Sequence, residues 1–277
     1  MKNLIPRAIS GLIYALIIIF GTTGHPWIFI GLMGVFLLIC LYEYISITEL
    51  SGKLHITLSF IASALIFYYY SDYLLGQYSV FVMSSMSFAG PVLFILAVYT
   101  IMFSTNELYI EFGKATVGII YTAVPFGLAL TIPSIGLDLG KEVISPEILY
   151  IFILIWLSDT MAYLVGSAFG KTKFAPKISE KKTWEGLIGG VIFTVIAGFV
   201  IHNYILPDNR FNWIIIGLIV AIFAPLGDLV ESKIKRSFNA KDSGNLIPGH
   251  GGFLDRLDSF IFVIPMVYLY ILLAEVL

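Results

Sequence analysis

The sequence predicts an all-α, polytopic membrane protein with about nine transmembrane helices. Three observations support this fold class. Hydrophobic residues make up 58% of the 277 residues and charged residues only 12%, about half the charged share of soluble proteins. Long apolar segments recur along the chain and are separated by Pro, Gly and charged residues. The Lys and Arg residues fall almost entirely in alternate connections between these segments.

Nine apolar segments have about the 20 residues that a helix needs to cross the hydrocarbon core of a bilayer. They are residues 4–23, 26–48, 54–71, 78–103, 113–134, 146–169, 184–206, 211–231 and 258–277. The fourth is long and contains Gly90-Pro91, where a kink is expected. The first is expected to be a retained span, because Lys2 and Arg7 precede an apolar run without a small-residue cleavage site.

Domain organisation is expected to be simple, with residues 1–277 forming one integral membrane domain. The single cysteine, Cys40, allows no intramolecular disulfide. A net charge of −2 argues against nucleic acid as a partner.

Orientation follows from the distribution of Lys and Arg. With nine spans, the N-terminus and the even-numbered connections share one side, which carries 14 of these 16 residues. The opposite side carries only Lys141 and Arg210. Because cytoplasmic loops are enriched in Lys and Arg, the N-terminus is predicted to be cytoplasmic and the C-terminus outside. The expected location is the cytoplasmic membrane of a bacterium.

Two connections on the predicted cytoplasmic side, 171–185 and 228–258, together hold 17 of the 34 charged residues. They can therefore form one site, at the cytoplasmic ends of the C-terminal helices. An alternative is that Lys171, Lys173 and Lys177 are topology signals that contact anionic lipid, each worth about 1 kcal/mol. That alternative does not explain the carboxylates among them.

Asp159 lies well within the sixth apolar segment, where a lone carboxylate costs about 2.5–3.5 kcal/mol on insertion scales. It could be a buried, hydrogen-bonded residue that fixes helix packing. The functional interpretation is a polar group that lines a cavity open toward the 171–186 connection.

Four carboxylates flank the second charged connection in a regular pattern. Asp228 and Glu231 stand at i and i+3 at the inner end of one span, and Asp255 and Asp258 repeat this spacing at the start of the next. Mg²⁺ accepts few carboxylates and completes its octahedron with water and substrate phosphates. The pattern predicts a Mg²⁺ site, although salt bridges such as Glu231 to Lys235 could account for some of these residues.

Cations and glycines between the carboxylates suit phosphate binding. Arg binds phosphate as a fork and Lys as a point charge, and the candidates are Lys233, Lys235, Arg236 and Lys241. Gly251 and Gly252 allow backbone N–H groups to approach an anion, and His250 could donate to a phosphate or hold a turn. Together these features indicate phosphoryl or nucleotidyl transfer to a lipid, without naming the nucleotide.

At these residues the chain closely resembles the CDP-diacylglycerol synthases, or phosphatidate cytidylyltransferases. The signature of that family is met by Ser232, Lys235, Arg236, Lys241, Asp242, Gly244, Pro248, His250, Gly251, Gly252, Asp255, Arg256 and Asp258. An upstream block is also similar, with Asp159, Ala162, Tyr163, Gly166, Ser179, Lys181, Lys182, Thr183, Trp184, Glu185 and Gly186. The resemblance is strong over about 155–260 and general over 1–150.

The resemblance implies an enzyme that converts CTP and phosphatidate into CDP-diacylglycerol and pyrophosphate in a lipid bilayer. It also implies a requirement for Mg²⁺, a homodimer and, in some members, a second cation such as K⁺. On this basis we expect residues 1–145 to form a scaffold with dimer contacts and 146–277 to carry the catalytic helices and loops. Asp228 and Asp255 become the expected metal ligands, with Asp258 and Glu231 in support.

The same resemblance extends to the other site residues. The expected catalytic residues are Asp228, Lys235, Arg236, Lys241, His250 and Asp255. The expected substrate-binding residues are Asp159, Ser179, Lys181, Lys182, Thr183, Glu185, Asp242, Gly251, Gly252 and Arg256.

Two other functions fit the charged connections less well. A CTP-dependent kinase acting on a polyprenol or phytol alcohol would need similar cations and metal, together with a general base for the hydroxyl. A cation-coupled transporter would use Asp159 and Asp228 along a cation path and would not bind nucleotide.

Overall fold

The computed structural model describes residues 4–74, 80–103, 110–135, 146–175, 179–207, 209–244, 246 and 251–276. Within these ranges, the side chains of 4–8, 73, 80–87, 134, 179–181 and 275–276 are not described. The architecture is helical throughout, with a single two-stranded hairpin among the described residues. The all-α fold class is therefore confirmed.

Helices occupy each of the nine expected segments in the described part of the chain. They are α1 (Leu4–Thr23), α2 (Pro26–Ile47), α3 (Lys53–Leu74), α4 (Val80–Phe103), α5 (Glu111–Thr131), α6 (Pro146–Phe169), α7 (Trp184–Val200), α8 (Trp213–Ser237) and α9 (Leu254–Val276). A short 3₁₀ helix, η2 (Ile132–Ser134), follows α5, and a π-helix, η3 (Ile201–Ile205), continues α7.

Helices α8 and α9 extend furthest beyond the apolar segments that predicted them. Helix α8 continues past residue 231 to Ser237, and Lys235 and Arg236 in its last turn favour this because cations are stabilised at helix C-termini. Helix α9 begins at Leu254 rather than 258, with Asp255 in its first turn, where carboxylates are favoured. The four carboxylates predicted to bind metal, Asp228, Glu231, Asp255 and Asp258, are therefore all helical.

The hairpin between α6 and α7 was not expected. Strands β1 (Lys173–Ala175) and β2 (Ser179–Thr183) pair antiparallel, with Lys173 opposite Thr183 and Ala175 opposite Ser179. The backbone N–H of Trp184 donates to the carbonyl of Thr172 at 2.9 Å, so pairing continues to the start of α7. The hairpin gives the charged connection a defined backbone.

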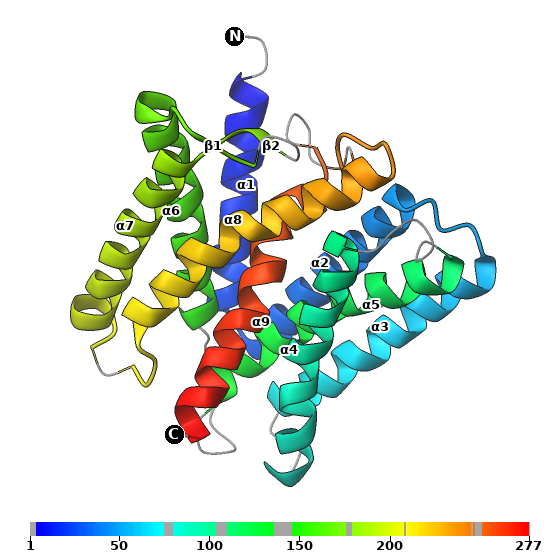
Figure 1. The fold of residues 1–277 in the computed structure, drawn as a ribbon. Coiled ribbons are helices and arrows are strands. Elements are labelled where there is room, and N and C mark those ends of the chain that lie inside the picture. Colours follow the sequence, from blue (N-terminus) through cyan, green and yellow to red (C-terminus); the bar gives the residue numbers. More distant parts are fainter. Residues whose placement is uncertain are drawn as a thin grey trace. The chain divides into compact units, whose positions relative to one another are not determined.

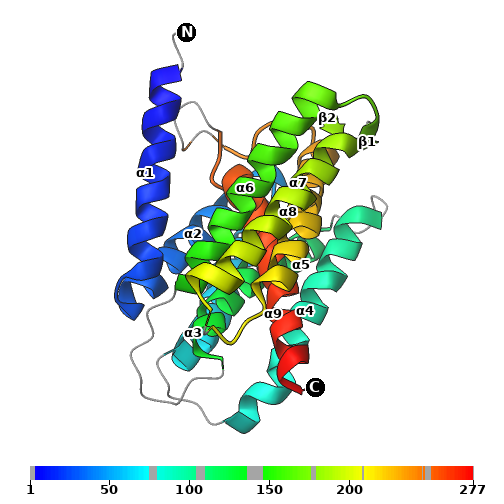
Figure 2. The same cartoon turned by 90° about the vertical axis from the view of Figure 1, so that its left-hand side faces the viewer.

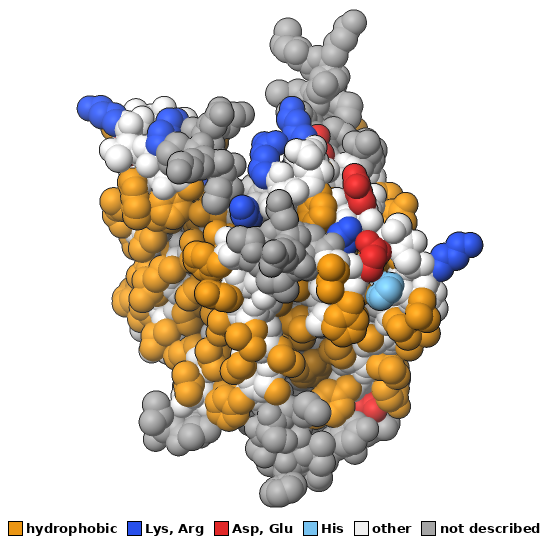
Figure 3. Space-filling model, turned by 45° about the vertical axis from the view of Figure 1, so that its right-hand side comes forward, with side chains coloured by type: hydrophobic (Ala, Val, Ile, Leu, Met, Phe, Trp, Pro, Cys, Tyr) orange, Lys and Arg blue, Asp and Glu red, His pale blue; other side chains and the backbone are white. Residues whose placement is uncertain are grey.

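Seven of the described helical segments are long and apolar enough to span a membrane. They are Pro26–Ile47, Lys53–Asp72, Glu111–Thr131, Pro146–Phe169, Trp184–Ile205, Trp213–Ser237 and Leu254–Ala274. In α1 and α4 the described apolar parts are shorter, Ile9–Thr23 and Phe88–Phe103. Hydrophobic side chains cover most of the helix surface seen in Figure 3, as expected for a multi-pass membrane protein.

The chain groups into two compact units. The first consists of Met1–Leu149 and Lys233–Leu257, and the second of Tyr150–Ser232 and Asp258–Leu277. The expected division at residue 145 lies close to one of these boundaries. Residues 233–257, however, group with the N-terminal helices rather than with the rest of the C-terminal half.

Within the first unit, α5 packs against α2, α3 and α4 (Figure 1). Two tyrosine rings lie directly on glycines of α5, Tyr44 on Gly118 and Tyr70 on Gly127. A Cβ at either glycine would overlap the ring, so the glycines permit this close packing. The ring of Tyr121 is fully buried beside Tyr44, which gives the unit an aromatic core.

Within the second unit, small residues bring helices close together. Helices α6 and α7 lie side by side in both ribbon views (Figures 1 and 2), and a Cβ at Gly189 would lie 2.5 Å from a methyl carbon of Val165. A Cβ at Gly217 of α8 would lie 2.9 Å from the carbonyl oxygen of Thr194 in α7. Such contacts are typical of helix pairs in membranes, where backbones approach through small residues.

Candidate active site

A cluster of three carboxylates forms in the second unit, where α8 crosses α9. Asp228, Glu231 and Asp258 each offer one oxygen atom, and these atoms lie within 4.8 Å of one another. We call these three residues the carboxylate cluster. Asp258 and Glu231 are buried, whereas Asp228 is partly exposed.

Gly227 allows this crossing. A Cβ at this position would lie 2.6 Å from the carbonyl oxygen of Asp258 and 2.9 Å from the Cβ of Phe262. The hydroxyl of Ser259 also donates to the carbonyl oxygen of Ala224 at 3.1 Å, linking the two helices beside the cluster. The close approach of the α8 and α9 backbones at Gly227 therefore brings Asp258 next to Asp228 and Glu231.

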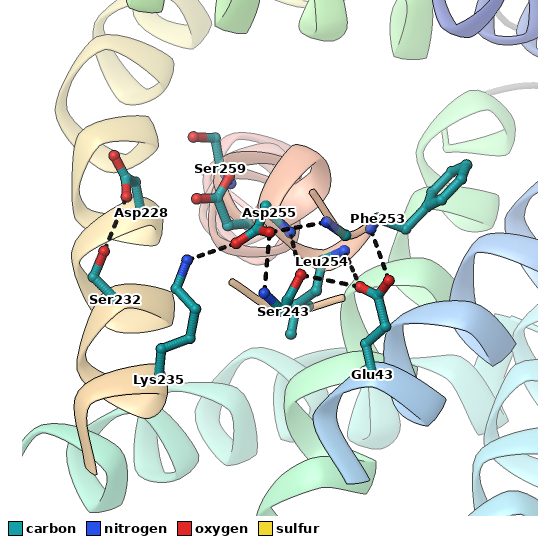
Figure 4. A network of polar contacts seen from close by, with 11 residues as sticks. Glu43, Asp228, Ser232, Lys235, Ser243, Phe253, Leu254, Asp255 and Ser259 are labelled. Carbon is teal, nitrogen blue, oxygen red and sulfur yellow. Dashed lines mark hydrogen bonds and ion pairs between the residues drawn. The ribbon is translucent and has the colours of Figure 1, made fainter. Parts of the chain in front are cut away.

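Lys182 joins the charged hairpin to this cluster. Its ammonium group lies 2.8 Å from Oδ2 of Asp228 and also donates to the carbonyl oxygen of Pro225 at 2.8 Å. Oδ1 of the same carboxylate accepts from the hydroxyl of Ser232 at 3.3 Å (Figure 4). The structure thus brings the 171–185 connection and the start of the family signature to one place in this unit.

Asp159 on α6 belongs to the same electrostatic environment. Asp258 interacts through space with Asp228, Asp159 and Lys182. The side chain of Asp159 is exposed in the isolated chain rather than buried in a packed interface. This exposure favours the cavity-lining interpretation over the packing interpretation.

Thr183 and Glu185 organise the start of α7. The hydroxyl of Thr183 accepts from the N–H of Gly186 at 3.2 Å, which is an N-cap interaction. Both carboxylate oxygens of Glu185 accept from the N–H of Thr172, at 3.1 and 3.2 Å. These contacts hold the hairpin against the helix, and the predicted contact of Thr183 and Glu185 with substrate stays a prediction.

A second polar network occupies the first unit, within the signature. Oδ1 of Asp255 lies 2.5 Å from the ammonium group of Lys235, and Oδ2 accepts from the N–H groups of Ser243 at 3.1 Å and Gly252 at 3.0 Å (Figure 4). Asp255 therefore has a cationic partner and two backbone donors. The assignment of Asp255 as a metal ligand stays a prediction. Among the described residues, the carboxylates that come together are those of Asp228, Glu231 and Asp258.

Four further signature residues are exposed, as expected for groups that could meet a soluble anion, namely Arg236, Lys241, Asp242 and Arg256. Gly251 has a φ of 86°, a left-handed conformation that only glycine adopts readily, and its ideal Cβ would lie 2.9 Å from Oδ2 of Asp255. Ser179 and Lys181 lie in β2, but their side chains are outside the described part, and His250 is outside it entirely.

Glu43 of α2 was not among the predicted site residues. It is 2% exposed, and its carboxylate accepts from the hydroxyl of Ser243 and from the N–H groups of Phe253 and Leu254. The signal that singled out Asp159, a lone carboxylate inside an apolar segment, applies equally to Glu43 within 26–48. That signal could have identified it.

Comparison with known proteins connects this geometry to a family. The model of the Cytidylyltransferase family matches residues 5–274 of the chain. The chain belongs to the Cytidylyltransferase family. Membership covers both units, including the N-terminal helices that lack diagnostic motifs, and confirms the resemblance seen in the signature.

Curated members of the family share substantial identity with this chain. A protein named phosphatidate cytidylyltransferase from Staphylococcus aureus (strain COL) is 41% identical over 175 residues, which cover 62% of this chain and 64% of that protein. One of the same name from Bacillus subtilis (strain 168) is 38% identical over 203 residues, covering 72% and 73%. The match to the first relative thus spans a little under two thirds of its length.

Proposed function

We propose that this protein transfers the cytidylyl group of CTP to phosphatidate, giving CDP-diacylglycerol and pyrophosphate. The observation that carries the proposal is the contact of Lys182, from the upstream block, with the carboxylate cluster, which includes Asp258 of the signature. Family membership and the names of the relatives support the choice of reaction.

The carboxylate cluster suits a divalent cation. Three carboxyl groups with oxygens within 4.8 Å of one another repel when ionised, and Lys182 contacts one of them. Oxygen donors from Asp228, Glu231 and Asp258 match the preference of Mg²⁺, which these residues would hold. When bound, Mg²⁺ would neutralise phosphate charge and polarise phosphate oxygens. A second cation such as K⁺ belongs to the same proposal.

The reaction needs positioning and charge neutralisation rather than covalent help from the protein. A phosphatidate oxygen attacks the α-phosphorus of CTP, a new P–O bond forms, and the bond from that phosphorus to the bridging oxygen of the β-phosphate breaks. Pyrophosphate leaves with the electron pair. No general base is required, because a phosphate monoester is already ionised at neutral pH.

Cationic side chains would take up the charge of the two anionic substrates. Lys182 is held beside the carboxylate cluster by Asp228 and the Pro225 carbonyl, so its charge is fixed in place before substrate arrives. Lys235 is fixed in a similar way by Asp255. Arg236 and Lys241 are exposed and would contact the triphosphate or the leaving group.

The site would face the cytoplasm, with CTP entering from the aqueous side and phosphatidate from the inner leaflet of the bacterial cytoplasmic membrane. The N-terminus would then be cytoplasmic and the C-terminus outside. Nothing in the proposed chemistry requires more than one chain, and a homodimer remains the expectation from the family resemblance.

The test is direct. Purified protein is incubated with CTP labelled in the cytidine, phosphatidate and Mg²⁺, and label is expected in the lipid with pyrophosphate released. Release of CDP with a polyprenol or phytol acceptor would show a lipid kinase instead. Absence of label from lipid in a folded sample would overturn the proposal.

A further inference from the structure

Glu43 is a buried carboxylate whose described partners are all neutral. It lies in α2, is 2% exposed, and accepts three hydrogen bonds from a segment about 200 residues away. Oε2 accepts from the hydroxyl of Ser243 at 3.1 Å and from the N–H of Leu254 at 2.7 Å, and Oε1 accepts from the N–H of Phe253 at 3.0 Å (Figure 4). A carboxylate is buried only where such donors replace water.

These donors lie at both ends of the signature loop, residues 243–254. Ser243 opens it, and Phe253 and Leu254 close it at the first turn of α9, where the N–H groups have no partner within the helix. A negative charge is also favoured at this position by the helix dipole. Glu43 therefore caps α9 from another helix and ties the two ends of the loop together.

Two glycines of the signature fit around this carboxylate. A Cβ at Gly244 would lie 2.6 Å from Oε1 of Glu43, and one at Gly252 would lie 2.6 Å from Oε2 and overlap the hydroxyl of Ser243. These distances are shorter than real Cβ contacts. Gly244 and Gly252 are thereby explained by the space that Glu43 occupies as well as by any approach to phosphate.

Ser243 connects Glu43 to Asp255. Its hydroxyl donates to Glu43 and accepts from the N–H of Asp255 at 3.3 Å, while its own N–H donates to Oδ2 of Asp255 at 3.1 Å. Asp255 in turn holds Lys235. A continuous set of hydrogen bonds thus runs from α2 to the Asp255–Lys235 ion pair.

Aromatic packing holds the same turn from α1 and α2. The ring of Phe253 lies 5.5 Å from that of Phe36 and 6.4 Å from that of Tyr14. The hydroxyl of Tyr14 donates to the carbonyl oxygen of Arg256 at 3.3 Å. The N-terminal helices therefore contact the start of α9 through apolar packing and hydrogen bonds, so loss of Glu43 alone leaves other contacts in place.

We propose that Glu43 is a positioning residue for the reaction, which fixes the two ends of the signature loop and through Ser243 sets the orientation of Asp255 and Lys235. This inference rests on the proposed function, since it assumes that the loop serves cytidylyl transfer. It gives the N-terminal half of the chain a role in the site, because α2 supplies the carboxylate.

The decisive variant is Glu43→Gln, which keeps the size of the side chain. Both oxygens of Glu43 face backbone N–H groups, so the NH₂ of glutamine would face a donor whichever way it is turned. Glu49→Gln is the matched control, since Glu49 lies just beyond the same helix and is exposed. The full chain is purified in lipid nanodiscs for each variant.

Three quantities are measured: kcat and KM for CTP, the thermal unfolding temperature, and hydrogen exchange of peptides covering 243–257. For Glu43→Gln we expect kcat to fall at least tenfold with KM for CTP within about threefold, because a misplaced ion pair weakens transition-state binding most. Exchange in 243–257 is expected to accelerate at least tenfold. Glu49→Gln is expected to match the unchanged protein in all three.

The alternatives give different results. A lower unfolding temperature with unchanged kcat per folded molecule would make Glu43 a stabilising residue only and overturn the proposal. If Glu43→Gln does not fold, Ser243→Ala decides, because it removes the hydroxyl that joins Glu43 to the N–H of Asp255 and leaves both backbone donors to Glu43 in place. A reduced kcat in Ser243→Ala supports positioning, and an unchanged kcat refutes it. If the unchanged protein transfers no cytidylyl group, the proposed function fails, and hydrogen exchange alone tests the anchoring of the loop.

Discussion

Asp258 is the member of the carboxylate cluster that comes from a different helix, so its loss removes the contribution of α9 to the proposed metal site. Asp258→Asn keeps the side-chain size and removes the charge. We expect kcat to fall by about 100-fold or more, as for other losses of electrostatic stabilisation, and the Mg²⁺ concentration for half-maximal activity to rise. Steady-state assays over a Mg²⁺ series measure both, with Glu49→Gln as the exposed control.

Asp255→Asn is the informative comparison, because this carboxylate contacts Lys235 and two backbone N–H groups. If Asp255 positions Lys235, its amide variant should lose kcat without a change in Mg²⁺ dependence. If it binds metal, as the family resemblance implies, the Mg²⁺ dependence should shift as in Asp258→Asn. A wild-type kcat in Asp255→Asn would contradict both roles.

Lys182 offers a second prediction at the residue scale. Its ammonium group is fixed between Asp228 and the Pro225 carbonyl, whereas Lys173 at the other strand of the hairpin is exposed. Lys182→Ala is expected to reduce kcat/KM for CTP by about 100-fold or more. Lys173→Ala should lose less than about tenfold, the value of a lysine that contacts only the lipid surface. Equal, slight losses in the two variants would make the hairpin a topology signal.

The residues of the site differ in how readily the sequence reveals them. Asp228 and Glu231 share a helix face because of their i, i+3 spacing, and this follows from helix geometry alone. The contact of Glu43 with Ser243 joins positions 200 apart, and no periodicity encodes such a pairing. The only local signal for Glu43 was its position as a single carboxylate within an apolar segment. That signal predicts a buried polar contact but does not indicate which residue makes it.

At the scale of elements, the crossing of α8 and α9 sets the geometry of the carboxylate cluster. Gly227→Ala would place a methyl group 2.6 Å from the Asp258 carbonyl and 2.9 Å from Phe262 Cβ, so the helices must separate. We expect a loss of about 1–3 kcal/mol in the free energy of unfolding, typical of overpacking, and a large loss of kcat. Thermal or denaturant unfolding in nanodiscs and steady-state kinetics measure the two effects.

Gly31→Ala in α2 is the matched control, since a Cβ there meets no atom within 4 Å. Alanine has the higher helix propensity, so this variant should be as stable as the unchanged protein or slightly more stable. Equal behaviour of the two glycine variants would show that the close crossing is unimportant for the site.

Apolar length was sufficient to locate the helices but not all of their ends. The boundaries of α1, α2 and α6 lie within one residue of the expected segments, because each is bounded by Pro, Gly or a polar turn. Helices α8 and α9 extend beyond their expected segments because their charged terminal turns are also helical. A criterion based on apolar length does not detect such turns. The β1–β2 hairpin was missed since its five-residue second strand, SEKKT, has no apolar alternation.

At the scale of the whole molecule, the arrangement of the chain in the membrane is open to a direct test. The 14-to-2 distribution of Lys and Arg predicts that the 171–185 and 228–258 connections are cytoplasmic. Contact of Lys182 with Asp228 agrees with this prediction, since the 171–185 connection and the start of the 228–258 connection then lie at one end of the second unit. Thiol labelling tests whether that end faces the cytoplasm or the outside of the cell.

Single cysteines are introduced in a Cys40→Ala background, which removes the buried native cysteine. Ala175→Cys in β1 and Asn245→Cys in the signature loop should react with an impermeant thiol reagent only after the inner face is exposed. Arg210→Cys, between α7 and α8, should react from outside in intact cells, because an odd-numbered connection lies on the opposite side. Labelling of position 175 in intact cells would show that the orientation is the reverse of the prediction. Labelling of positions 175 and 245 from opposite sides would contradict a shared site, because two loops separated by the bilayer cannot contribute to one active site.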